Sequence, residues 1–245
     1  RGEKHHWWPK SLSRFWKNDD GHVNRINISG DCVSSNPKEF AHIRNGHNFI
    51  VSGGSPWEST FEHEFDLPDR NMAVVVDDLN AFREWNHFEK RFDFAIQDED
   101  GENLNLLRSC IVSLVVRSPF YRSKLDNIVI SLRGDISKND SKNLISANMG
   151  QNYRSFLESG MNRGKFAILF SDEGEFIYGD GFYNTISSSP QALSTFEVII
   201  PMTPNIAVIW ISPRSYESKP RAIAINVDEN DVHAINQATQ IYSKD

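Results

Sequence analysis

The sequence predicts an α+β fold, with one domain over residues 1–245, a helical middle and a mostly antiparallel sheet in the C-terminal part. In the middle of the chain, apolar residues recur at the spacing of one helix face. The clearest run comprises Leu104, Leu107, Ile111, Leu114 and Val115. From Phe166 onward, short apolar runs separated by turn residues replace this pattern. Because helices and strands are segregated along the chain, α+β is favoured over alternating α/β.

Composition and charge narrow the class of protein further. The chain has 245 residues, of which 39% are hydrophobic and 24% charged, which is typical of globular proteins and disfavours disordered or fibrous classes. A net charge of −7 argues against a surface that binds nucleic acid or anionic membrane throughout, although a local basic groove stays compatible with it. Cys32 and Cys110 form no zinc-type or redox motif and indicate a reducing, cytoplasmic setting. No apolar run approaches the ~20 residues that cross a bilayer, so no membrane partner is expected.

In the first third of the chain, Pro9 predicts the first position of a short helix, because its missing N–H costs nothing there. That helix carries Leu12, Phe15 and Trp16. A short strand or a hairpin is predicted around residues 23–31, and the alternation in Phe61–Phe65 predicts a half-buried strand with His63 on its apolar side.

Helices dominate the middle of the predicted fold. Val75, Leu79 and Phe82 recur at helical spacing. The run that begins at Leu104 should end near Arg117, since residues before a proline avoid helical geometry. Two further elements are expected: a turn at residues 98–101 and a helix within residues 134–163.

The C-terminal third predicts strands and one last helix. Asp228 is a good N-cap for that helix. Residues 172–174 predict the turn of a hairpin. The predicted strands are 166–170, 176–178, 196–200, 206–211 and 222–227.

The rarest local feature is the run His5-His6-Trp7-Trp8-Pro9. A histidine before a helix N-terminus could serve as a general acid or base, and the helix end could bind an anion. Equally, the tryptophans could pack while one histidine is buried and the other solvated. A His-Asn-His nuclease shares the His-His-x-x-Pro run, but its downstream asparagine and helix-borne histidine are missing. The other histidines, His42, His47, His63 and His87, are interpreted as scattered structural residues.

Two further residues are candidates for a polar site. Arg117 borders the apolar stripe of its helix, where it could hold a phosphate or carboxylate with two hydrogen bonds, or form a structural salt bridge. Asp180, in Gly179-Asp180-Gly181, is predicted at a strand end, where site residues often lie. The sequence has no nucleophile elbow, phosphate-binding glycine loop or dinucleotide fingerprint, which disfavours the common hydrolase, NTPase and dehydrogenase classes.

Taken in order, these motifs resemble the bacterial family known as domain of unknown function 4238. The likeness rests on His5-His6-Trp7-Trp8-Pro9, Arg117-Ser118-Pro119 and Pro201-Met202-Thr203-Pro204. The family's Ser-Asp-x-Pro element is matched only by the aspartate of Gly179-Asp180-Gly181-Phe182, which leaves the role of Asp180 open. The resemblance spans nearly the whole chain and implies one continuous domain without an established activity.

If these motifs converge, His5, His6, Arg117 and Asp180 would combine a base, an anion clamp and an orienting or metal-binding carboxylate. The leading hypothesis is therefore a hydrolase acting on a phosphodiester, such as a nuclease, in bacterial defence, with a divalent metal as an optional cofactor. A second hypothesis is a non-catalytic module that binds a small anionic ligand or a protein partner through Trp7, Trp8 and Trp57. In a third, the motifs only maintain the fold.

Overall fold

The structure is a computed structural model. It describes residues 4–44, 46–49, 59–85, 88, 90–97, 102–134, 138–160, 164–184, 197–211 and 219–243. Three predicted features, Trp57, His87 and the turn at residues 98–101, lie outside the described residues.

The helical middle consists of four helices: α2 (Asp66–Trp85), α3 (Glu102–Arg117), α4 (Pro119–Arg133) and α5 (Lys138–Gly160). Helix α3 packs against both α2 and α5, and α4 packs against α5. The predicted end of α3 is confirmed, because Arg117 is its last residue and Ser118 caps α4 by accepting a hydrogen bond from the N–H of Tyr121. The proline that ends one helix thus occupies the first turn of the next, where its lack of an N–H is tolerated.

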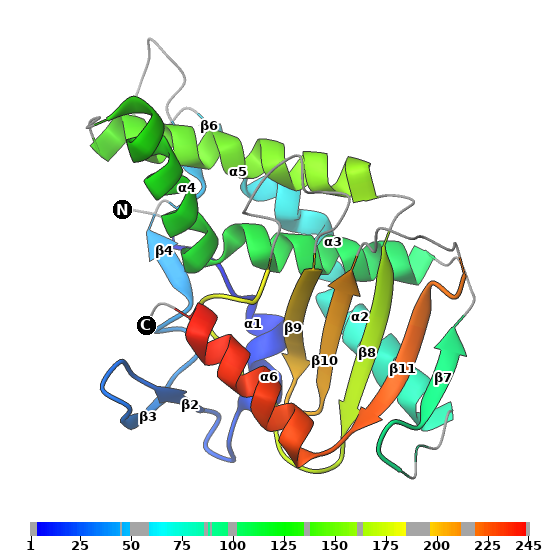
Figure 1. The fold of residues 1–245 in the computed structure, drawn as a ribbon. Coiled ribbons are helices and arrows are strands. Elements are labelled where there is room, and N and C mark those ends of the chain that lie inside the picture. Colours follow the sequence, from blue (N-terminus) through cyan, green and yellow to red (C-terminus); the bar gives the residue numbers. More distant parts are fainter. Residues whose placement is uncertain are drawn as a thin grey trace.

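The sheet has five strands in the order β7-β11-β8-β10-β9 (Figure 1). They are β7 (Phe94–Gln97), β8 (Lys165–Ser171), β9 (Glu197–Thr203), β10 (Ile206–Ile211) and β11 (Ala222–Val227). Neighbouring strands are antiparallel, except that β8 and β11 are parallel. The predicted α+β class, with a helical middle and a mostly antiparallel C-terminal sheet, is confirmed.

The alternation of side chains along the strands gives the sheet two apolar faces. On β8, Phe166, Ile168 and Phe170 belong to the large core that includes the buried residues of α2, α3 and α5. Leu169 and Val227 face the other way and pack with Val232 of α6 (Glu229–Tyr242). Figure 1 shows α6 in front of the sheet and α2 behind it. The predicted cap of α6 is confirmed, because the Asp228 side chain accepts a hydrogen bond from the N–H of Asp231.

The N-terminal quarter forms short elements beside this layered core. Strand β1 (Lys4–His6) pairs with β4 (His42–Arg44), and β2 (Val23–Ile26) forms a hairpin with β3 (Cys32–Ser35), one of the two predicted alternatives. The remaining elements are α1 (Lys10–Ser13), η1 (Arg14–Trp16), β5 (Asn48–Phe49), β6 (Ser59–Thr60) and η2 (Glu62–Phe65).

The histidines precede a short helix as predicted, since α1 begins directly after Pro9, and they lie on strand β1, for which β4 supplies a pairing partner from a distant segment. Two local predictions are wrong. Residues 62–65 form the 3₁₀-helix η2 leading into α2, and His63 is exposed. Residues 176–178 form no strand, because both edges of β8 are already paired, with β10 and β11. In both cases non-local packing overrides a short alternating pattern.

None of the described helices is both long and apolar enough to span a membrane.

Candidate functional site

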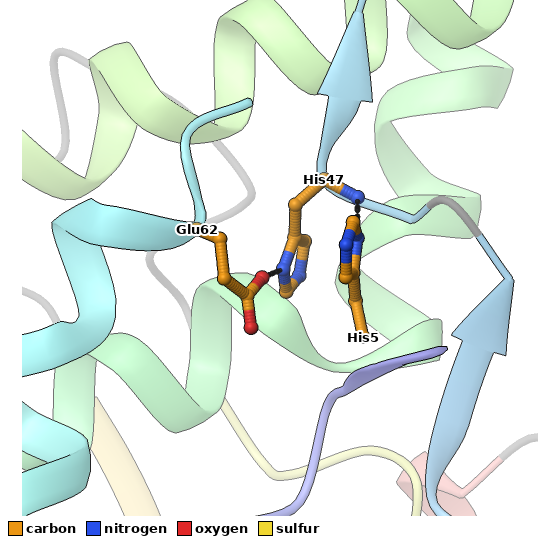
Figure 2. A group of neighbouring side chains, drawn as sticks. All are labelled: His5, His47 and Glu62. Atoms are coloured by element: carbon orange, nitrogen blue, oxygen red, sulfur yellow. Dashed lines mark hydrogen bonds and ion pairs between the residues drawn. The ribbon is translucent and has the colours of Figure 1, made fainter. Parts of the chain in front are cut away.

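Three polar side chains from separate segments meet beside β1. His5 comes from β1, His47 from the turn that precedes β5, and Glu62 from the start of η2 (Figure 2). The pairing of His5 with Ile43 brings the end of β4 to β1, and the chain then turns through Gly46 to His47. Pairing of β5 with β6 places Thr60, and hence Glu62, next to the same turn. Both histidines are buried, and the Glu62 side chain is partly exposed.

Directed hydrogen bonds hold the cluster together. The backbone N–H of His47 donates to Nδ1 of His5 over 2.8 Å. The side chains of His47 and Glu62 are hydrogen-bonded through Nδ1 and Oε2. The two imidazole rings stack with 4.9 Å between their centroids and 10° between their planes. Both rings are therefore fixed in position and orientation, as Figure 2 shows.

These hydrogen bonds define where the protons lie. Because Nδ1 of His5 accepts a proton from an amide, a neutral His5 carries its own proton on Nε2. Burial lowers the pKa of His47 to about 4, against the opposing effect of Glu62, so His47 is neutral near pH 7. Burial would raise the pKa of Glu62, but its hydrogen bond to His47 and the nearby positive charges outweigh this and lower it. An ionised Glu62 accepts the Nδ1 proton of His47 and leaves the lone pair on Nε2.

The surroundings of the cluster are aromatic and cationic. Phe61 and Phe65 lie 4.9 Å and 5.3 Å from His47, measured between ring centroids. The guanidinium of Arg117 lies 4.7 Å from the centroid of the Phe65 ring, on which it stacks. Arg122 donates from Nη2 to the carbonyl oxygen of Gly46 over 2.7 Å. Both arginines contribute to the low pKa of His47, after burial, which has the largest effect.

His5, His47 and Glu62 could also supply three ligand atoms to a metal ion, since these atoms lie within 4.8 Å of one another. Zn²⁺ accepts this ligand set at about 2.0–2.2 Å per bond, so the three residues would have to move closer together. If His5 bound the metal through its Nδ1, the hydrogen bond from the His47 amide would also break. If His5 bound it through its Nε2, the proton on that nitrogen would have to leave. Two nearby arginines disfavour a cation at the same place. The observed arrangement therefore suits proton transfer better than metal binding.

The structure places the four predicted site residues in different surroundings. Only His5 belongs to the cluster. His6 is the next residue on β1 and lies edge-on to His42, with 5.9 Å between ring centroids. The pKa of His6 is lowered mainly by burial and, to a smaller extent, by the positive charge of Lys10. Because successive side chains of a strand point to opposite faces, His6 does not share the position of His5.

Arg117 is buried and engaged with Asp69, its Nη2 lying 2.7 Å from Oδ1. Asp180 lies in a buried loop rather than at a strand end, and its carbonyl oxygen accepts a hydrogen bond from the N–H of Phe120. A Cβ atom at Gly181 would collide with the backbone of Tyr242, so this part of the Gly-Asp-Gly turn needs glycine to approach α6. Asp180 lines a surface groove that His5, His6 and Arg117 do not line. The four residues thus do not form one site: Arg117 lies beside the cluster but is paired with Asp69, and Asp180 lines the separate groove.

The tryptophans of the N-terminal run also separate. Trp8 is fully buried and stacks on Tyr178 with 4.4 Å between ring centroids, which supports the packing interpretation for this residue. Trp7 is partly buried and lines the groove.

Sequence reasoning missed two members of the cluster. His47 was assigned to the scattered structural histidines, and Glu62 lay within the segment predicted as a strand. In the strand prediction His63 pointed inward, whereas η2 turns Glu62 toward His47 and leaves His63 in solvent. The sequence contains one signal for the position of His47, the glycine Gly46 directly before it. That glycine is compatible with a tight turn but does not indicate which side chains His47 contacts.

Searches for similar proteins gave no match among family models, curated proteins or solved structures. The resemblance to domain of unknown function 4238 therefore stays a prediction.

Proposed function

We propose that the protein is a hydrolase in which His47 is the general base, Glu62 orients it and the stacked ring of His5 holds it in place. The hydrogen bond between Nδ1 of His47 and Glu62 carries this proposal. It directs the lone pair of Nε2 away from Glu62, and Nε2 makes no hydrogen bond within the described part of the chain. A base held by a carboxylate is the arrangement that activates water or a hydroxyl nucleophile in many hydrolytic sites.

In the proposed reaction, Nε2 of His47 takes a proton from a water molecule as the water oxygen forms a bond to phosphorus. The bond from phosphorus to the leaving oxygen then breaks, and the imidazolium of His47 returns the proton to that oxygen. Glu62 stabilises the transient positive charge on His47. The positive field of the nearby arginines stabilises the negative charge that increases on the non-bridging phosphate oxygens.

A phosphodiester is the proposed substrate because the cluster lies in a positive local field within an acidic protein. Arg117 and Arg122 both act electrostatically on His47, while the whole chain has a net charge of −7. Neither arginine is offered as a catalytic residue, since each already donates hydrogen bonds inside the protein. We place this activity in a reducing cytoplasm, a proposal supported by the two cysteines, which are free.

The experiment measures hydrolysis of bis(p-nitrophenyl) phosphate by the wild-type chain and by His47→Gln, Glu62→Gln and His5→Ala. His47→Gln is expected to lower kcat/KM at least 100-fold, the usual contribution of a general base being about 10²–10⁴. His63→Ala is the matched control, because His63 is next to Glu62 in sequence but exposed, and its rate should stay within about twofold of the wild-type rate.

Melting temperatures of the same variants separate catalysis from folding. The proposal would be contradicted if the wild-type chain released nitrophenol no faster than buffer alone does. It would also be contradicted if the His47→Gln variant were as active as the wild type. Equal losses of folding and activity in every variant would assign the cluster a structural role. Activity should persist in EDTA, since the proposed base needs no metal. A loss in EDTA that Zn²⁺ restores would replace the general-base proposal by a metal site.

A further inference from the structure

A second feature, separate from the histidine cluster, is a groove of about 1530 Å³ between the β2–β3 hairpin, β4, the start of α4 and the end of α6. Figure 1 shows β4, α4 and the C-terminal end of α6 at the same end of the molecule. The groove has an apolar mouth, where Ile26 and Ile28 are 57% and 85% exposed. Trp7 and Phe40 add aromatic surface to its lining.

Arg122 is one of three arginines that line this groove, together with Arg25 and Arg44, and two carboxylates, Asp126 and Asp180, also line it. The side chain of Arg122 lines the groove, and its Nε atom is buried without a hydrogen-bond partner among the described residues. Its one observed hydrogen bond is donated from Nη2 to the carbonyl oxygen of Gly46. In the described part of the chain no carboxylate is within ion-pair distance of it, and Asp126, one turn further along α4, is engaged with Ser141. Arg117, five residues earlier and fully buried, has Asp69 as its counter-ion, whereas Arg122 is half-buried and forms no ion pair with the described residues.

A partly desolvated cation without a counter-ion is costly, because the lost hydration of the guanidinium is offset by no opposite charge. Burial lowers the pKa of Arg122 to about 10, which reflects this cost, yet the group stays charged near pH 7. The planar guanidinium matches carboxylate and phosphate groups with two parallel hydrogen bonds, so an anionic ligand is suited to supply the missing charge.

We propose that the groove binds a small amphipathic anion, whose carboxylate or phosphate group pairs with Arg122 and whose apolar body lies along the groove. The apolar body is proposed because aromatic and aliphatic side chains, among them Trp7, Phe40 and Ile130, line the same groove as Arg122. The volume exceeds the ~300–1,000 Å³ typical of drug-sized ligands, so the body is extended rather than compact. This proposal does not depend on the hydrolase, because it concerns binding in a groove that His5 does not line.

The test compares three probes with the same eight-carbon chain: octyl phosphate, octanoate and octanol. Calorimetric titration should show that at least one of the two anions binds at least tenfold more tightly than octanol, and that anion should raise the melting temperature. Comparison of octyl phosphate with octanoate shows which head group, phosphate or carboxylate, the groove binds more tightly. Equal affinity of octanol and both anions would overturn the proposal, as would the failure of all three to bind.

Arg122→Met removes the charge and keeps an unbranched apolar side chain. It is expected to weaken anion binding at least tenfold and to leave the melting temperature of the free protein unchanged or higher, since the Gly46 carbonyl oxygen also accepts from Ser146. Arg70→Gln makes the same charge change at an exposed site and should leave binding within about twofold. Arg122→Gln is a second neutral variant with the same expected loss.

Unchanged anion affinity in either Arg122 variant would overturn the proposal. A large drop in melting temperature, or failure to fold, in both variants would assign Arg122 a structural role and overturn it too. His47→Gln should bind the anionic probe as wild type does, so loss of hydrolysis and loss of binding are distinguishable.

Discussion

Arg117 and Asp69 form a two-pronged ion pair that joins the end of α3 to the start of α2. Nη1 of Arg117 lies 3.0 Å from Oδ2 of Asp69, and Nη2 lies 2.7 Å from Oδ1. The guanidinium also donates to the backbone oxygen and the hydroxyl of Ser113. This buried arginine thus has the structural salt bridge that the sequence left open as the alternative to an anion clamp.

We predict that Asp69→Ala destabilises the protein more than Arg117→Met does. The first change leaves a fully buried cation without a counter-ion, whereas the second leaves a carboxylate that is 39% exposed and hydrated. The loss for Asp69→Ala should be about 3 kcal/mol, at the low end for a broken buried pair because of that exposure. Urea unfolding measures both values. Arg70→Ala is the control and should cost less than about 0.5 kcal/mol, and a similar cost for all three variants would contradict the prediction.

A second prediction concerns Trp8. Its ring is fully buried and stacks on Tyr178, so Trp8→Ala should lower the free energy of unfolding by about 3–5 kcal/mol. Trp7→Ala removes a ring that is only partly buried and should cost less than half as much. Chemical denaturation followed by circular dichroism, which does not rely on the deleted fluorophore, gives both values. A Trp7→Ala variant as unstable as Trp8→Ala would show that the assigned packing is incorrect.

The elements that the sequence predicted well are those with long, uniform patterns. Helix α3 ends at Arg117 as expected, and β11 has the predicted bounds Ala222–Val227. Short segments were predicted poorly, because five residues such as Phe61–Phe65 fit a strand and a helical turn almost equally. Their conformation depends on partners far along the chain, which a local pattern does not contain.

The pH dependence of stability should report on His47. Its pKa is about 4 in the folded protein and near 6.5 in the unfolded chain, so between these values the unfolded chain binds a proton that the folded protein does not. Stability should therefore fall as the pH falls from about 6.5 to 4, by up to about 3 kcal/mol from this group.

Urea unfolding at several pH values tests this, with His47→Gln as the variant and His63→Gln as the control. His47→Gln should flatten the curve in this window, whereas His63→Gln should leave its slope unchanged. Parallel curves for wild type and His47→Gln would contradict the assignment of a buried, neutral His47.

Thiol reactivity gives a fourth prediction. Cys32 is exposed, while Cys110 is buried and contacts the Pro68 carbonyl oxygen, and burial raises the pKa of Cys110 to about 12. Because the thiolate is the reactive form, only Cys32 should react with Ellman's reagent in the native protein. Titration should therefore release one equivalent at once and a second only in denaturant. Two equivalents released at the same rate without denaturant would contradict the burial of Cys110.

The candidate site was harder to predict than the fold. His5 was identified because an adjacent histidine pair is rare, but its partners His47 and Glu62 have no rare neighbours in sequence. They meet it only through the pairing of β1 with β4 and of β5 with β6. Arg122, on which the groove proposal rests, belongs to no motif in the sequence, and the missing counter-ion of a side chain is visible only in three dimensions.

The parallel pair β8 and β11 has a consequence for how the chain assembles as it is synthesised. Among the described strands, β7 pairs with β11 alone, through contacts such as Ala95 with Ala224. A nascent chain thus exposes β7 unpaired while α3, α4, α5 and three other strands of the sheet are made. Long-range pairings of this kind form slowly, and unpaired strand edges favour aggregation in the meantime. Insertion of β11 between β7 and β8 is consequently the step that completes the sheet and ends that vulnerable interval.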